Sequence, residues 1–235
     1  MKQFKNLALV LLFTTGMISC QEEETKLVLS NQEADMEVIT EDLLTEIDAL
    51  TDEVIDLELG WLKSGSIEEN VLVVGCPVVT YDRVSLPHTI TIDYGTGCEG
   101  GDGKIRSGKI IISSTAFENL SVKRENTFDN FYVEGKKIEG KISKTVTFSM
   151  EDLTRVAVVE EEITVTFEDN TSLTRKANLT REHYIGIPGI RIDDQTKTWG
   201  EAITSRPSGI TITKTISEDT PLIFKASCRQ IVSGM

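Results

Sequence analysis

The chain has 235 residues, a formal charge of -14 at pH 7 and four cysteines. Its length is enough for one all-β domain of ordinary size or for two small ones. Nucleic acids and anionic lipid surfaces are bound through clusters of Lys and Arg, so the acidity argues against both as partners. Solubility outside the cell is the simpler reason for such a charge.

Residues 1–19 have the pattern of a secretory signal peptide. Two lysines precede an apolar run at 7–13, which is too short to span a bilayer as a stable helix. The sequence MISC at 17–20 resembles the lipobox of bacterial lipoproteins, in which the signal peptidase cuts before a diacylated cysteine. We therefore predict that Cys20 is lipidated and holds the mature chain on a membrane without crossing it. The alternative is an ordinary signal peptide that happens to end at a cysteine.

The residues that follow Cys20 predict the membrane in which the lipidated chain is anchored. Gln21 stands where an aspartate would retain a lipoprotein, so the pattern resembles that of lipoproteins sent on to the outer membrane. The glutamates at 22–24 resemble the acidic export tag that carries lipoproteins of Bacteroidota-type bacteria to the cell surface; alternatively, they belong to a solvated linker. We predict an outer-membrane protein at the cell surface, with residues 20–34 as its lipidated cysteine and acidic tether.

An amphipathic helix is predicted for residues 35–63. A largely apolar set of side chains recurs there at alternating spacings of four and three, which places it on one helix face. Eleven acids and no Lys or Arg lie between residues 27 and 62, so a self-associating coiled coil would have no basic partners beside its seam. We expect the stripe to pack on the protein's own sheet, with a partner-binding zipper as the alternative. The stripe consists of Met36, Thr40, Leu43, Ile47, Leu50, Val54, Leu57 and Trp61.

Residues 64–235 are predicted to form an antiparallel β domain. Apolar residues alternate with Thr, Lys and Glu, and turn signals recur every 8 to 14 residues. The predicted fold class is therefore mainly β: an antiparallel meander, curled into an open sheet, a roll or a sandwich, preceded by one acidic amphipathic helix. The predicted buried faces carry Ile138, Ile142, Val146 and Phe148 in one strand, Ile163, Val165 and Phe167 in the next, and Leu173, Ala177 and Leu179 in a third.

The cysteines other than Cys20 predict one disulfide. Cys76 and Cys98 lie 22 residues apart and each adjoins a turn signal, so we pair them. The chain-entropy argument gives such a bridge a stabilisation of about 3 kcal/mol. Cys228 is left without a partner.

Four motifs in the central part of the chain suggest a family. They are CPVVT at 76–80, TIDYGTGC at 91–98, GDGKIRSGKI at 101–110 and TFDNFYV at 127–133. Together they resemble a family of surface lipoproteins of Bacteroidota-type bacteria, and this resemblance implies no particular activity. It does imply that a segment like 226–234 continues into a second unit with another glycine-flanked cysteine. On that basis we expect the chain to be shortened at its C-terminal end, with the partner of its last cysteine missing.

The sequence predicts no catalytic residues and no cofactor. His88 and His183 lie in different predicted strands and lack the spacing of zinc ligands, and neither a G-x-S-x-G elbow nor a phosphate-binding loop occurs. Carboxylate pairs such as Glu160 with Glu162, and the acids at 193–194, keep a carboxylate-dependent hydrolase open as an alternative.

One glycine-rich loop, within residues 89–109, carries weak candidates for calcium ligands. Asp93, Glu99 and Asp102 could supply oxygen atoms, although their spacing is not that of an EF-hand. The other interpretation is a tight structural turn, in which glycines supply positive φ angles and Cys98 pins the loop.

A non-catalytic binding or structural module is the predicted function, with a glycan or a protein as the unknown partner. The first alternative is a glycan-binding accessory of a polysaccharide-uptake system, with Trp199, Phe128, Phe131 and Tyr132 as candidate stacking platforms. A spacing of three places Phe128 and Phe131 on opposite faces of a regular strand, and core packing is the competing interpretation for both. The second alternative is the hydrolase.

Overall fold

The computed structural model describes residues 32–64, 70–72, 76–149, 151, 154–184, 194–225, 227 and 230–233. The predicted signal peptide, Cys20, the greater part of the tether and Cys228 lie outside these residues. The described elements are α1 (Gln32–Ser64), β1 (Asn70–Leu72), β2 (Val78–Asp82), β3 (His88–Asp93), β4 (Cys98–Glu99), β5 (Ile105–Ser114), β6 (Ser121–Val133), β7 (Lys136–Ser149), β8 (Thr154–Thr166), β9 (Ser172–Tyr184), β10 (Gln195–Ser205), β11 (Thr211–Ile216), β12 (Leu222–Lys225) and β13 (Gln230–Ser233).

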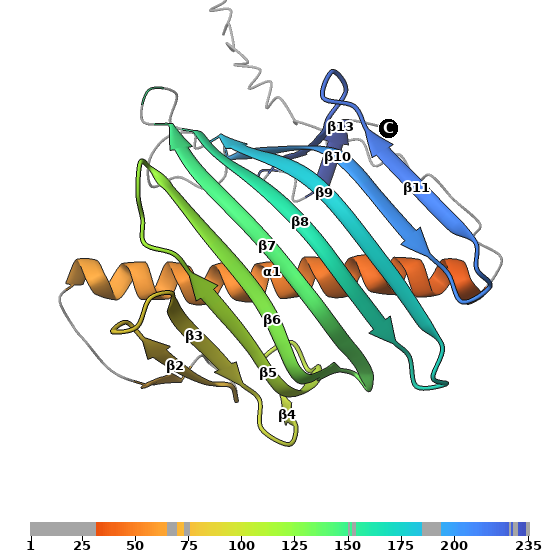
Figure 1. The fold of residues 1–235 in the computed structure, drawn as a ribbon, viewed down its shortest axis with the longest axis horizontal. Helices are drawn as coiled ribbons and strands as arrows, with labels where there is room; N and C mark the ends of the chain where they lie inside the picture. The colour runs from red at the N-terminus through yellow and green to blue at the C-terminus, as the bar shows by residue number, and fades with distance from the viewer. Residues whose placement is uncertain are drawn as a thin grey trace, which may run out of the picture.

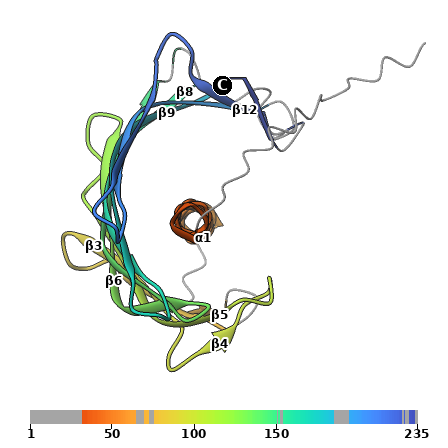
Figure 2. The ribbon, with the colours of Figure 1, turned by 90° about the vertical axis from the view of Figure 1, so that its right-hand side faces the viewer.

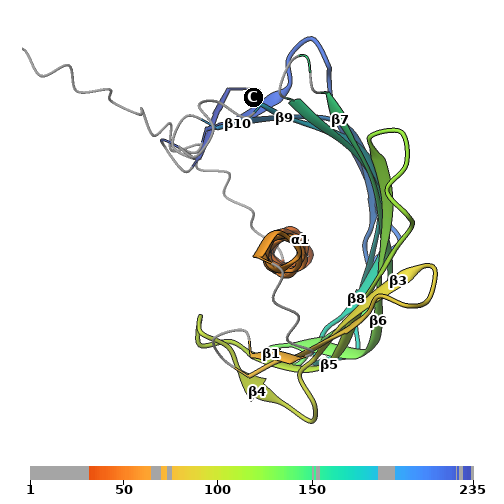
Figure 3. The same ribbon diagram turned by 90° about the vertical axis from the view of Figure 1, so that its left-hand side faces the viewer.

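All the described strands belong to one antiparallel sheet, which confirms the predicted meander (Figure 1). The order is β1-β2-β3-β5-β6-β7-β8-β9-β10-β12-β13, and β4 pairs with β5. Strand β10 carries two neighbours on one edge: β11 pairs with residues 200–205 and β12 with residues 195–198. The sheet curls strongly but does not close, so it has a concave and a convex face (Figures 2 and 3).

Helix α1 lies inside the curl, along the concave face (Figures 2 and 3). Its bounds contain the predicted range 35–63, and its apolar stripe packs on the chain's own sheet, as expected. Leu43, Leu44 and Ile47 are buried in one cluster with the inward residues of the strands. Buried Thr40 donates its hydroxyl proton to the carbonyl of Met36 at 2.9 Å, which satisfies this polar group within the helix.

The side chains of Val54, Leu57 and Trp61 lie outside the described part of the chain. Within the described part, no helix combines the length and the apolar character of a membrane span.

The core fills the space between the helix and the concave face. Inward side chains alternate along each strand, and those of the central strands are almost fully buried, because they meet both the helix and each other across the curl. The predicted buried faces are confirmed for Ile138, Ile142, Val146, Ile163, Val165, Leu173 and Leu179, while Phe148, Phe167 and Ala177 are partly buried against the same cluster.

A β-bulge between β5 and β6 overturns one prediction. Phe128 and Phe131 were expected on opposite faces, yet Phe131 is fully buried in the core and Phe128 packs against it, with ring centroids 5.7 Å apart. The register shifts here, because two residues of β6, Asn130 and Phe131, lie opposite the single residue Gly108 of β5. Asn130 and Gly108 both have positive φ angles, 47° and 79°. The extra residue reverses the alternation, so both rings point inward.

The predicted disulfide between Cys76 and Cys98 is present, with its Cα atoms 5.9 Å apart. It ties the residues just before β2 to the start of β4. The glycine-rich loop is therefore pinned at one side by a covalent bond and at the other by the pairing of β4 with β5.

Candidate functional site

A row of carboxylates on α1 meets cations on the concave face, and we call these contacts the ion-pair row. The acids lie beside the apolar stripe, at helical spacings such as 37 and 41 or 48 and 52, so they reach the sheet on either side of it. We expect the row to help set the position of the helix along the curl, and the substitution of Asp48 considered below tests this. Its described pairs are Glu37 with Arg206 and Lys214, Glu41 with Arg175 and Lys214, Glu46 with Lys104 and Arg106, Asp48 with Lys144 and Arg181, and Asp52 with Lys144.

Asp48 is the centre of the row, because it bridges two strands. Its carboxylate lies 2.5 Å from Nζ of Lys144 on β7 and also accepts a hydrogen bond from Nη1 of Arg181 on β9. Burial raises the pKa of Asp48, but attraction to Lys144 and Arg181 outweighs burial, so the pKa lies below its usual value. Asp48 therefore stays ionised and holds both cations against the helix.

Two further carboxylates of the row are held by cations. Glu46, two residues before Asp48, accepts hydrogen bonds from Arg106, which is 3 % exposed and also donates to Asp102. At the N-terminal end of the row, burial raises the pKa of Glu37, yet hydrogen bonds from Arg206 and Lys214 outweigh it, so the net pKa is lowered. The lowered pKa values of Glu37 and Asp48 thus keep both carboxylates charged beside the cations of the sheet.

Between the helix and the C-terminal strands lies a cavity of about 620 Å³, which we call the apolar cavity. Its charged lining residues are already paired with one another in the ion-pair row or, for Glu161, with Arg175 at 2.8 Å. Phe224 and Ile231 line it and remain 41 % and 54 % exposed. Its principal apolar lining residues are Leu44, Leu179, Ile216, Leu222, Phe224 and Ile231.

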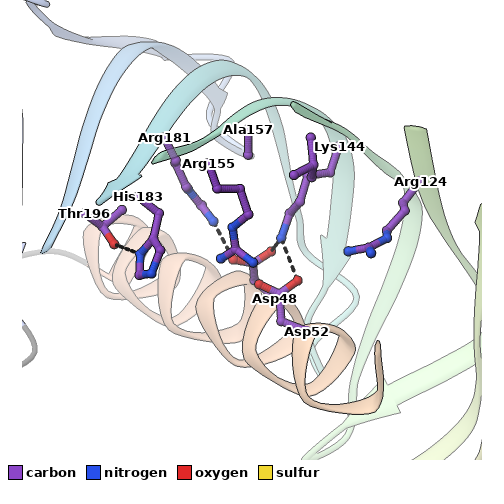
Figure 4. Close-up of a pocket in the computed structure, with 10 residues that line it drawn as sticks. Asp48, Asp52, Arg124, Lys144, Arg155, Ala157, Arg181, His183 and Thr196 are labelled. Atoms are coloured by element: carbon purple, nitrogen blue, oxygen red, sulfur yellow. Dashed lines mark hydrogen bonds and ion pairs between the residues drawn. The ribbon is translucent and has the colours of Figure 1, made fainter. Parts of the chain in front are cut away.

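A second cavity of about 150 Å³ adjoins the first, and we call it the cationic pocket (Figure 4). The two cavities share Asp48, Arg181 and Thr196 as lining residues, so the pair of Asp48 with Arg181 stands between them. The pocket is lined by Asp48, Asp52, Arg124, Lys144, Val146, Arg155, Ala157, Arg181, His183 and Thr196.

His183 forms one wall of the cationic pocket. Its Nδ1 lies 3.0 Å from the hydroxyl of Thr196, and its Nε2 lies 3.8 Å from Asp194. Burial and the positive charge of Arg155 lower the pKa of His183 below its ordinary value, although Asp194 acts in the opposite direction. The imidazole is therefore neutral at neutral pH.

Two of the three calcium candidates, Asp93 and Asp102, are engaged in other contacts. Asp93 pairs with Lys109 at 2.8 Å and accepts a hydrogen bond from the backbone nitrogen of Gly95. Asp102 pairs with Arg106 at 2.6 Å, and the hydrogen bonds from Arg106 lower its pKa. Among the described residues, no three His, Cys, Asp or Glu side chains come together in a group that could hold a metal ion. The geometry favours the structural turn, and several of its glycines have the positive φ angles that this interpretation requires.

The two histidines are not brought together, whereas Glu160 and Glu162 are both exposed on β8 and line one pocket. His88 lies on β3 and His183 on β9, which are not neighbouring strands. Glu162 points outward and pairs with Lys176 at 2.7 Å, and Asp193 lies outside the described residues.

The aromatic candidates do not form an exposed platform. Phe131 is fully buried and Phe128 partly so, while Tyr132 and Trp199 are half-buried.

Sequence reasoning missed the inward cations. Lys144 lies between inward Ile142 and Val146, and Arg181 comes two residues after inward Leu179. A charged residue at an inward position of a strand, in a chain with an acidic helix, was the available signal.

The architecture is an open, strongly curved antiparallel sheet around one helix. Comparisons with protein-family models, with curated proteins and with solved structures find no match to this chain.

Proposed function

We propose that this chain is a non-catalytic binding protein, anchored in the outer membrane through a lipid on Cys20, that holds a small and largely apolar molecule in the apolar cavity. The observation that carries the proposal is the cavity itself, about 620 Å³ in volume and walled by aliphatic and aromatic side chains. Ligand cavities of proteins fall in the range of roughly 300 to 1,000 Å³ and have this kind of lining.

The state of the lining residues supports an apolar ligand. Phe224 and Ile231 are about half exposed on the concave side of the sheet, although burying such side chains stabilises a fold by about 2 kcal/mol each. A ligand that covered them would recover part of this free energy. The charged groups of the wall already have partners, so they set the edges of the cavity rather than compete for the ligand.

The same pairing supports a non-catalytic role. Glu41, Asp48 and Glu161 line the apolar cavity, and each contacts an arginine within 3 Å. A general acid or base needs a carboxylate that is free to face its substrate, whereas these three are turned toward arginines. The location at the outer membrane rests on the signal pattern, the cysteine and the acidic residues 22–24.

The test uses the mature chain from residue 20 with Cys20→Ser, which retains every residue that the structure describes. Binding of N-phenyl-1-naphthylamine is followed by its fluorescence. Thr198→Phe places a ring in the apolar cavity from the inward face of β10, and we expect it to weaken binding at least about tenfold, because it fills the ligand's space.

Glu201→Phe is the matched control, because Glu201 lies on the exposed outward face of the same strand. We expect this variant to bind the probe like the parent chain. Equal binding by the parent, Thr198→Phe and Glu201→Phe would show that the probe binds elsewhere, and absence of binding to the parent would refute the proposal.

A further inference from the structure

The cationic pocket carries more positive than negative charge. Arg124, Lys144, Arg155 and Arg181 line it, against the two carboxylates of Asp48 and Asp52. Figure 4 shows the four cationic side chains reaching from β6, β7, β8 and β9 toward the helix. In a chain whose net charge is -14, this concentration of positive charge is local to the concave face. Such a concavity attracts anions, because its walls exclude water and weaken screening.

Arg155 takes no part in the ion-pair row. Asp48 takes Lys144 and Arg181, and Asp52 takes Lys144 at 3.1 Å. Within the described part of the chain, no carboxylate forms an ion pair with Arg155, which is half-buried and lines the pocket. A half-buried guanidinium is satisfied best by a bidentate anion such as a carboxylate or a phosphate.

The pocket has the size and the place of a head-group site. Its volume of about 150 Å³ equals roughly five water molecules in the liquid, which is room for one carboxylate or phosphate group. It shares the wall of Asp48, Arg181 and Thr196 with the apolar cavity. An anionic group in the cationic pocket would therefore lie directly beside an apolar chain in the apolar cavity.

We infer that the two cavities together bind a single-chain anionic amphiphile, with its anionic head at Arg155 in the cationic pocket and its acyl chain in the apolar cavity. This inference rests on the proposed function, since it uses the apolar cavity for the chain. It adds the head-group site and the sign of the ligand's charge.

The experiment compares four ligands with the same twelve-carbon chain, each displacing N-phenyl-1-naphthylamine from the mature chain with Cys20→Ser. They are dodecanoate, dodecanoyl lysophosphatidate, dodecan-1-ol and dodecyltrimethylammonium. We expect both anions to bind at least about tenfold more tightly than the alcohol, and the cation to bind least. The ratio between the carboxylate and the phosphate then identifies which head group the pocket prefers.

The variants locate the head group. Arg155→Gln removes the charge, and we expect it to weaken binding of the preferred anion about tenfold while binding of dodecan-1-ol stays unchanged. Arg155→Lys keeps the charge and retains most of the affinity. Lys176→Gln, an exposed site on the same sheet that pairs outward with Glu162, loses the same charge and serves as the matched control.

The outcomes separate the two proposals. Equal affinity for anions and alcohol, or an Arg155→Gln variant that binds anions like the parent, overturns the head-group site and leaves the apolar cavity in place. If Arg155→Gln binds all ligands more weakly, dodecan-1-ol included, Arg155 has a structural role, and the head-group site is overturned as well. If none of the four ligands displaces a probe whose binding Thr198→Phe weakens, the amphiphile is the wrong ligand and the apolar cavity stays in place; if the probe itself does not bind, the proposed function is wrong.

Discussion

The substitution Asp48→Asn tests whether the ion-pair row holds the helix in the curl. Asparagine keeps the size of the side chain but removes the charge that bridges Lys144 and Arg181. Removal of one member of a buried ion pair costs about 3–5 kcal/mol, because the remaining charge is left without compensation. Lys144 retains Asp52 at 3.1 Å, and the side chain of Arg181 is 28 % exposed, so the lower end of this range applies. We expect a loss of about 3 kcal/mol in the free energy of unfolding.

Urea titration followed by circular dichroism measures this loss, since urea leaves the ion pairs unscreened. A change of about 3 kcal/mol corresponds to a fall in Tm of roughly 6–12 °C for a chain of this size. Asp42→Asn is the matched control: Asp42 lies on the same helix and is exposed, so its substitution should change the stability by no more than about 0.5 kcal/mol. If the two variants differed by less than about 0.5 kcal/mol, the row would contribute nothing to the placement of the helix.

Two other expectations concern pH and the bulge. The pKa values of Glu37 and Asp48 are lowered in the fold, so their stabilisation is present above the unfolded value of about 4 and is lost as the pH falls below it. The lowered pKa of His183 should lower the urea midpoint modestly between pH 7 and 5.5, and the two carboxylates should lower it further between pH 5 and 3. An unchanged midpoint at pH 3 would contradict this. Gly108→Ala should destabilise by more than about 3 kcal/mol in the same titration, because a Cβ there would lie 1.9 Å from the carbonyl oxygen of Asn130. Gly95→Ala, with a similar positive φ but open space, should cost only about 1–2 kcal/mol, and equal losses would refute the role of close contact.

Local patterns were sufficient to predict most of the fold. The period-two alternation around Ile138 to Phe148 defines an inward face whatever the strand pairs with, and the spacing of Leu43 and Ile47 defines a helix face in the same way. The disulfide followed from two cysteines beside turns. These features depend on neighbours in sequence, and a sequence displays such neighbours directly.

The bulge and the site depend on contacts that the sequence does not display. A single extra residue near Asn130 changes which face Phe131 occupies, and nothing in the alternation marks where the register shifts. The pairing of Asp48 with Arg181 joins residues 133 positions apart, so it appears only once the sheet has curled around the helix. The alternation places Lys144 and Arg181 on the inward face, but it does not show which acids they meet there.

Helix α1 is synthesised before the strands that hold it in place. Each hairpin of the meander joins neighbouring segments, whereas the contacts of α1 reach far ahead: Glu33 bonds to Ser208 across 175 positions and Glu37 to Arg206 across 169. Closing loops of this length has an entropic cost that short hairpins avoid. We therefore expect the helical segment, although it is synthesised before the strands, to dock after them. Its eleven acids, with no Lys or Arg between residues 27 and 62, give it a repulsive charge that we expect to oppose self-pairing in the interval.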